Sequence, residues 1–317
     1  AIPLGHQSDW RGIDNDGNGY VDDVHGYNFI DNPDVEGWGT HDGEEVVPVK
    51  PQDHGTHVAG TIAAVTNNGK GVAGVAGGSG KGDGVRIMTL QILGGDNTSS
   101  DQNAAVRAME YAADMGAVIS QNSWGNNPGV ITSDSNYKVA QSARYAAFNY
   151  FMKKQNHPAV DGGIIVFAAG NESAPMAGYP GAYNEYIAVT ALGPDGLPAS
   201  YTNYGPGRNI AAPGGEYFSN QFSHAKETGC VLSTLPCERD ASGNITNGEV
   251  YGYMQGTSMA TPHVSGVAAL ALSYAEDLGK SYTTDQFKEI ILTSVQDINA
   301  YLLDGWVKYD SNGYEMQ

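Results

Sequence analysis

The sequence has few cysteines and few positive charges. Its 317 residues include two cysteines, and Lys plus Arg number 16 against 35 for Asp plus Glu, a formal net charge of -19. Two cysteines exclude a disulfide framework and leave either one short-loop bridge between Cys230 and Cys237 or two thiols. The acidic balance argues against nucleic acid or an anionic membrane as the main partner, and it suits the binding of cations.

Long apolar runs, internal repeats, low-complexity tracts and linkers are also absent from the sequence. Because no apolar run reaches about 18 residues, no segment is expected to span a membrane. Apolar residues make up 40% of the chain, which is enough for a sizeable core, and we expect one domain over residues 1–317. The opening AIPLGHQSDW has neither an initiator Met nor a signal-like stretch, so we expect an upstream segment.

Apolar runs alternate with segments of helical period along most of the chain. The period and composition predict strands within 85–93, 117–124, 163–171 and 186–193, and helices within 99–116, 138–154, 258–279 and 283–295. Thr283 and Gln286 form a capping box before the last helix. The alternation predicts an α/β fold with a mostly parallel sheet and helices on both faces. Residues 216–250 interrupt it with polar residues and both cysteines, which indicates a surface insertion.

One serine lies between a glycine turn and a predicted helix. In GTSMATPHVSG, residues 256–266, Ser258 follows Gly256 and Thr257 and opens a segment of helical period. Unpaired backbone N–H groups at a helix N-terminus favour a developing negative charge, so the position suits a nucleophile. The simpler interpretation is an N-cap serine. Pro262 is expected in the first turn, where its missing N–H costs little.

A histidine suited to act as a base lies far upstream. His54 begins HGTHVAG, residues 54–60, and His57 follows one helical turn later. Two histidines at this spacing also suit zinc, but no third ligand stands at a useful spacing. A histidine base needs hydrogen-bond reach to the serine in space, whatever their separation in sequence. Gly55 and Gly60 indicate close backbone packing around the first turns of this helix.

HGTHVAG at 54–60, AAGNES at 168–173 and GTSMATPHVSG at 256–266 occur in this order. These three blocks resemble the His, Asn and Ser motifs of subtilisin-like serine proteases, and the resemblance extends from about residue 12 to about residue 292. It implies a three-layer subtilisin-like α/β fold and a serine endopeptidase acting on polypeptides. It also implies a secreted or cell-envelope location.

The resemblance implies roles for particular residues. Ser258 would be the nucleophile, His54 the general base that later protonates the leaving amine, and Asn171 a side-chain donor to the oxyanion. The segment 123–125, SWG, resembles the extended stretch that pairs with substrate backbone. Trp124 either narrows a substrate subsite or packs beneath it. The Tyr179–Pro180 bond is expected to be cis. The implied substrate-binding residues are Ser123, Trp124, Gly125, Ala169, Gly170 and Gly178.

The chain departs from the family pattern at the triad aspartate. The family places it before the histidine, at the end of a buried strand in a segment like VAVIDTG, and nothing upstream of His54 resembles that segment. Asp53 adjoins His54, but the side chains of immediate neighbours at a helix start point apart. Asp31, after GYNFI, is the best substitute within the chain.

We therefore expect the N-terminal strand with its aspartate to be missing here, the domain to be incomplete at both ends, and an upstream fragment of the same precursor to supply the carboxylate. The alternative is an inactive or fragmentary protease-like domain that serves as a peptide-binding scaffold. An esterase is disfavoured because Ser258 lacks the Gly-x-Ser-x-Gly context.

An acidic, glycine-rich segment near the N-terminus has the spacing of a calcium loop. Positions one, three, five, seven and nine of an EF-hand-like loop would be Asp14, Asp16, Asn18, the Tyr20 carbonyl and Asp22. Position twelve is His25 instead of Glu, and Asp23 is the expected replacement ligand. We expect structural calcium here; the alternative is a turn held by Asx hydrogen bonds. A second loop, 67–72, resembles a calcium loop of the family through Asn68.

Overall fold

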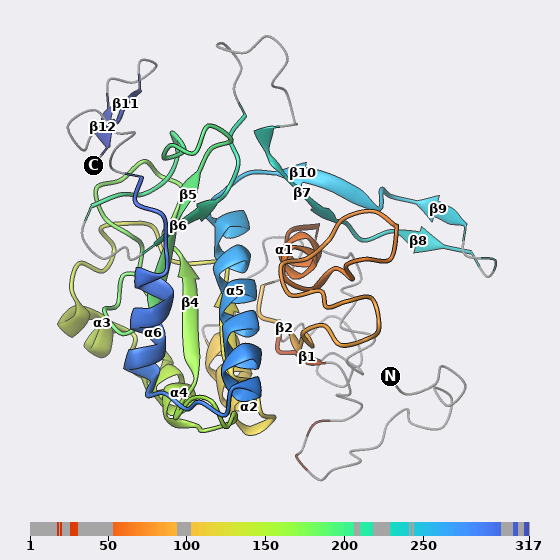
Figure 1. The fold of residues 1–317 in the computed structure, drawn as a ribbon. Coiled ribbons are helices and arrows are strands. Elements are labelled where there is room, and N and C mark those ends of the chain that lie inside the picture. The colour runs from red at the N-terminus through yellow and green to blue at the C-terminus, as the bar shows by residue number, and fades with distance from the viewer. Residues whose placement is uncertain are drawn as a thin grey trace.

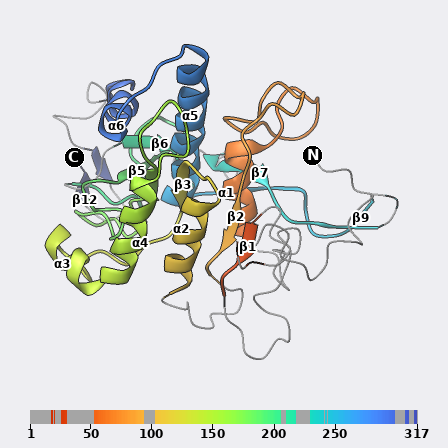
Figure 2. The ribbon, with the colours of Figure 1, turned by 90° about the horizontal axis from the view of Figure 1, so that it is seen from below.

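A parallel sheet forms the centre of the protein. Its strands follow the order β3 (Ile119–Asn122), β4 (Ile164–Ala168), β5 (Ile187–Leu192) and β6 (Ile210–Pro213), and each pairs in parallel with the next (Figures 1 and 2). This confirms the prediction of a mostly parallel α/β sheet. The computed structural model describes residues 18, 20, 26–30, 53–93, 103–205, 210–217, 229–240, 242, 244–298, 307–309 and 314–316.

Helices cover both faces of this sheet. One face carries α5 (Thr257–Asp277) and α6 (Thr284–Thr293), and the other carries α2 (Ala104–Asp114) and α4 (Ser142–Lys153). The alternation of side chains along a strand explains the two layers. In β4, Val166 belongs to the apolar cluster of α5, whereas Phe167 belongs to that of α2 and α4. Each such side chain contributes about 2 kcal/mol when fully buried.

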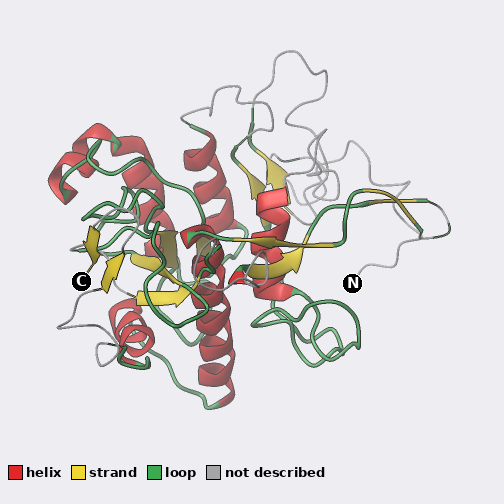
Figure 3. Ribbon diagram, turned by 90° about the horizontal axis from the view of Figure 1, so that it is seen from above, coloured by secondary structure: helices red, strands yellow, loops and turns green. Residues whose placement is uncertain are grey.

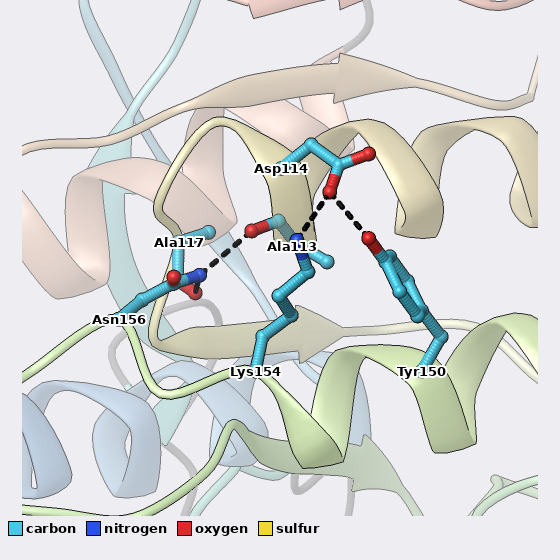
Figure 4. Close-up of polar contacts among 6 residues, drawn as sticks. All are labelled: Ala113, Asp114, Ala117, Tyr150, Lys154 and Asn156. Carbon is cyan, nitrogen blue, oxygen red and sulfur yellow. Dashed lines mark hydrogen bonds and ion pairs between the residues drawn. The ribbon is translucent and has the colours of Figure 1, made fainter.

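Polar contacts fix the end of α2 to the end of α4 (Figure 4). The carboxylate of Asp114 accepts hydrogen bonds from the Tyr150 hydroxyl at 2.6 Å and from Lys154 Nζ at 2.7 Å. The bond from Lys154 lowers the pKa of Asp114. Asn156 Nδ2 donates to the carbonyl of Ala113 in the last turn of α2, at 2.7 Å, and to that of Ala117, three residues beyond the helix, at 3.1 Å. The Ala113 carbonyl is one of the last four of the helix, which have no partner inside it, so Asn156 satisfies it.

Two short strands form a second parallel pair beside the main sheet. They are β1 (Gly26–Asn28) and β2 (Thr89–Gln91) (Figure 2). Helix α2 packs against both sheets, because Tyr111 lies in the apolar cluster of β1 and Ala112 lies in the cluster under β4. Leu90 of β2 packs against both clusters. In the described part of the chain, β2 and β3 do not pair with each other.

Helix α1 (Asp53–Ala63) packs against α5 and against an antiparallel ribbon of β7 (Val231–Thr234) and β10 (Tyr251–Met254). A Cβ at Gly60 would collide with the side chains of Ser233 and Thr234. Close packing at Gly60 is thereby confirmed. The expected close packing at Gly55 is wrong. Among the described residues, no atom outside the nearby backbone of the helix lies within 4 Å of a Cβ built at Gly55.

The ribbon continues away from the helical body as β8 (Glu238–Arg239) and β9 (Ile245–Asn247) (Figures 1 and 3). The segment 216–250, expected at the surface, therefore divides into an outer hairpin and a strand, β7, that lies against α1. Ser233 of β7 is fully buried. A last antiparallel pair consists of β11 (Val307–Tyr309) and β12 (Tyr314–Met316).

Several boundaries differ from the sequence-based expectations. The helix expected at 138–154 is two helices, α3 (Asp134–Ala140) and α4, because Gln141 leaves the helical conformation with φ -125° and ψ 44°. The strand expected at 85–93 is reduced to β2, whose partner β1 has only three residues. The capping box of Thr283 and Gln286 is confirmed at the start of α6.

Candidate active site

Ser258 is the second residue of α5, and Gly256 is the N-cap. The N-cap interpretation of Ser258 is therefore wrong. Gly256 has φ 147° and ψ 162°, a backbone conformation that L side chains rarely adopt, so glycine is needed for this turn into the helix. The Ser258 hydroxyl donates to the Ser123 carbonyl at 3.3 Å. This long contact leaves the hydroxyl weakly held at the helix N-terminus.

Pro262 changes the hydrogen bonding of the same helix. It lies inside α5, one turn further than expected. Because proline has no N–H, the carbonyl four residues earlier, that of Ser258, loses its helical donor. The Ser123 hydroxyl replaces the missing donor, because it donates a hydrogen bond to the Ser258 carbonyl at 2.7 Å. Residues 123 and 258 are thus held together by two hydrogen bonds that run in opposite directions.

The side chain of Asn171 is fixed by the residue before Ser258. Asn171 Oδ1 accepts from the Thr257 N–H at 2.8 Å and from the Thr257 hydroxyl at 2.9 Å. The Gly170 N–H donates a hydrogen bond to the Thr257 hydroxyl oxygen at 3.2 Å. Since both bonds engage the amide oxygen, the NH₂ group of Asn171 is turned away from Thr257. Asn171 is solvent-exposed, so this donor is accessible from outside.

A buried amide that the sequence did not single out supports the loop of Asn171. Asn203 is fully buried, and its Oδ1 accepts from the backbone N–H groups of Glu172 and Ala174, each at 3.0 Å. Its Nδ2 donates to the Ala169 carbonyl at 2.9 Å and to the Glu172 carboxylate at 2.8 Å. All four hydrogen bonds of this amide therefore fix residues 169–174.

The residues expected to bind substrate meet around this loop. The Asn126 N–H donates to the Tyr179 carbonyl at 2.8 Å, and a Cβ at Gly178 would collide with the Asn126 carbonyl, so the segments 123–126 and 178–179 run side by side. The Gly178 N–H in turn donates to the Ala169 carbonyl at 3.0 Å. The Tyr179–Pro180 bond is cis, as expected. The structure thus groups Ser123, Trp124, Gly125, Ala169, Gly170 and Gly178 beside Ser258 and Asn171.

His54 and His57 occupy the first turns of α1 in different environments. His57 is fully buried, and its Nε2 contacts the carbonyls of Val231 at 2.9 Å and Gly252 at 3.1 Å, so we assign the proton to Nε2. These contacts place the first turns of α1 beside the end of β10, which leads into Ser258. His54 is exposed, and desolvation by the surrounding protein lowers the pKa of its imidazole. Within the described residues, neither histidine belongs to a cluster of three potential metal ligands.

No carboxylate reaches His54 within the part of the chain that the structure describes, where no hydrogen bond or ion pair to its ring occurs. Asp31 lies outside the described residues, as do the expected calcium ligands Asp14, Asp16, Asp22 and Asp23. Asn18 Oδ1 accepts the Tyr20 N–H at 2.7 Å, which is the geometry of an Asx turn. Asn68 Oδ1 likewise accepts the Lys70 N–H, at 3.0 Å.

Cys230 immediately precedes β7, and Cys237 follows it. Residues 231–234 between them are extended, and four strand residues span about 13 Å at about 3.3 Å each. A disulfide needs Cα atoms within about 7 Å of each other. No bridge between Cys230 and Cys237 is present in the structure, and the extended strand explains why.

The scaffold and the residues grouped on it define a subtilisin-like protein. The structure is similar to that of proteases from Pseudoalteromonas arctica, with a TM-score of 0.58 and 29% identity, covering 88% of this chain and 81% of that one. It also resembles the prenylagaramide maturation protease PagA, with a TM-score of 0.59 over 80% of this chain and 76% of that one; at 24% identity this likeness concerns the fold alone. The chain belongs to the subtilase family, whose model matches residues 9–307.

Named relatives in the family are proteases. The extracellular basic protease of Dichelobacter nodosus is 32% identical over 255 residues, which cover 78% of this chain and 36% of that protein. Thermitase of Thermoactinomyces vulgaris is 33% identical over 251 residues, which cover 79% of this chain and 67% of that protein. The chain thus spans only part of the length of these relatives. Its described helices include none with the length and apolarity that crossing a bilayer demands.

Proposed function

We propose that the protein is a serine endopeptidase that cleaves peptide bonds through an acyl-enzyme on Ser258. The observation that carries the proposal is the fixed start of α5, where Thr257 holds the amide oxygen of Asn171 and leaves its NH₂ accessible beside the nucleophile. As Ser258 attacks, this NH₂ and the Ser258 N–H stabilise the oxyanion. His54 takes the proton of the hydroxyl and returns it to the leaving amine.

The substrate backbone would pair with the segment 123–125. Neither the N–H nor the C=O of Gly125 makes a hydrogen bond within the described residues. Such a free edge accepts an extended peptide as an added strand. The lowered pKa of His54 keeps its imidazole neutral at neutral pH, and only the neutral ring can accept the serine proton.

We further propose that an extended segment lies between β2 and β3 and brings a carboxylate to His54. In the described part of the chain these strands do not pair with each other, and the backbone groups at an unpaired strand edge need hydrogen-bond partners. Gln91 of β2 adds support, because its Oε1 is buried and lacks a donor among the described residues. The segment would belong to the same precursor. Without it, the inactive scaffold remains the second candidate.

The deciding experiment treats the purified protein with a fluorophosphonate and measures intact mass, with Ser258→Ala as the matched control. One adduct on the wild type alone is expected, since the probe needs an activated serine. A smaller co-purifying mass would identify the completing segment. Equal labelling of both forms, or labelling of neither, contradicts the endopeptidase.

We also propose that calcium binds the loop 14–23. Asn18 Oδ1 accepts one N–H, and an amide oxygen has a second lone pair with which to bind a cation. Removing calcium with EGTA should lower Tm, and restoring calcium, but not an equal concentration of sodium, should recover it. An unchanged Tm contradicts the proposal.

A further inference from the structure

We propose that Arg144 is a specificity-determining residue that binds an acidic side chain of the substrate. The inference rests on the proposed function, since it concerns the peptide that would pair with residues 123–125. Arg144 would contact a side chain of the bound peptide near the cleavage site, and not the peptide bond that is cleaved.

The guanidinium of Arg144 lies against the substrate-binding segment. Its Cζ is 5.2 Å from the centroid of the Trp124 ring. That ring is held in place by its Nε1 bond to Asn122 Oδ1 at 3.1 Å and by edge contact with Phe167, at 5.2 Å between ring centroids. A cation–π contact with a fixed ring limits the positions that the guanidinium adopts. Arg144 is therefore positioned before any ligand arrives.

The charge of Arg144 is not neutralised by the described protein. Its Nη1 donates to Gln141 Oε1 at 2.9 Å, a neutral acceptor, and its Nε is buried without an acceptor. Nη2 makes no hydrogen bond with the described residues and is not among their buried unpartnered atoms, so it is not fully buried. The neighbouring Tyr137 stays neutral because burial raises its pKa to about 12. Partly buried arginines are normally paired with a carboxylate. A ligand would supply the missing one.

The geometry of strand pairing directs a substrate side chain to this cation. Successive side chains of an extended segment point to opposite faces, so Trp124 points away from the face of Ser123 and toward Arg144. A residue directly opposite Trp124 on an added strand points to the same face, with its Cβ about 5 Å away. A glutamate at that position can reach Nη2. Because the protein carries a net charge of -19, a preference for an acidic residue needs a local cation such as this one.

The test measures peptide binding, so it does not need turnover. The full-length protein carrying Ser258→Ala is titrated with fluorescein-labelled octapeptides in which Glu replaces Gln at one position at a time, and anisotropy gives Kd. At one position Glu should bind about tenfold more tightly than Gln, as expected for a charge-assisted hydrogen bond. Adding Arg144→Gln should abolish this ratio.

Two further variants make the result specific. Lys138→Gln removes a cation that lies 5.2 Å from the rings of Tyr145 and Tyr183, and it should leave the ratio unchanged. Arg144→Lys keeps the charge and should retain part of the ratio, which protects the test if Arg144→Gln unfolds. Peptide binding with no Glu preference at any position, or with one that survives Arg144→Gln, overturns the inference alone. No binding by any peptide contradicts the proposed function and the inference together.

Discussion

Among single residues, Asn203 has the most consequence for the loop 169–174. Asn203→Asp removes both Nδ2 donors and turns a second carboxylate toward Glu172. Because the site is buried, we expect a loss of about 2–4 kcal/mol in the free energy of unfolding. If the endopeptidase proposal holds, kcat should fall about 10- to 100-fold through displacement of Asn171, with a smaller change in KM. Urea unfolding and steady-state kinetics check the two effects.

The control for Asn203→Asp is Asn184→Asp, which makes the same chemical change at an exposed position. It should leave both stability and kcat nearly unchanged. Equal effects of the two substitutions would show that added negative charge, and not the lost hydrogen bonds, is responsible.

Ser123 and Pro262 should be energetically coupled. Ser123→Ala removes the donor to the Ser258 carbonyl and should cost about 1–3 kcal/mol. In a Pro262→Ala background the new N–H can donate to that carbonyl along the helix, so the same substitution should cost about 1 kcal/mol less. Urea unfolding of the four proteins of this double-mutant cycle gives the coupling. Additivity within about 0.5 kcal/mol contradicts the account of the start of α5.

At the level of secondary-structure elements, the contact between α1 and β7 depends on one glycine, Gly60. Gly60→Ala would place a methyl group against Ser233 and Thr234, and we expect a loss of about 1–3 kcal/mol from overpacking. Gly55→Ala is the matched control on the same helix, where no described atom is near. It should be neutral or stabilise by up to about 1 kcal/mol, because alanine favours helix. Thermal unfolding of both variants tests the pair, and equal shifts contradict the packing argument.

The elements also show what the sequence could and could not predict. The motifs around His54, Asn171 and Ser258 are local, so their residue types and spacing are enough to locate them in the sequence. The role of Asn203 depends on contacts with residues 29 to 34 positions away, and the partnership of Ser123 with the Ser258 carbonyl spans 135 positions. No pattern of neighbouring residues in the sequence indicates either contact. The break between α3 and α4 at Gln141 is invisible in the sequence because helical periodicity continues through it.

For the whole molecule, histidines should govern stability in mild acid. Desolvation lowers the pKa values of His54, His57 and His263 in the folded protein below 6.5. A lowered histidine pKa means that the unfolded chain binds protons first, so stability is full above pH 6.5 and falls as the pH falls through the lowered values. Carboxylates with ordinary pKa values titrate near pH 4, which separates the two effects.

We therefore expect Tm to fall between pH 7 and pH 5 and the fall to be smaller in His57→Gln, because a protonated His57 would carry an Nδ1–H with no acceptor among the described residues. Burial raises the pKa of Glu216, which opposes this trend, so a Glu216→Gln variant should show a steeper fall. Calorimetry across this range measures both. A Tm independent of pH in the wild type contradicts the argument.

Within the described residues, one edge of β2 and one edge of β3 pair with no strand, and this bears on how the molecule behaves in concentrated solution. A strand edge recognises main chain and not sequence, so an edge that stays unpaired accepts any extended polypeptide, including a loop of a second copy. Self-association would therefore compete with the segment proposed above for the same backbone donors and acceptors. If the proposed segment completes the sheet, the fraction of monomer should rise when the segment is added, and dilution alone should also favour the monomer.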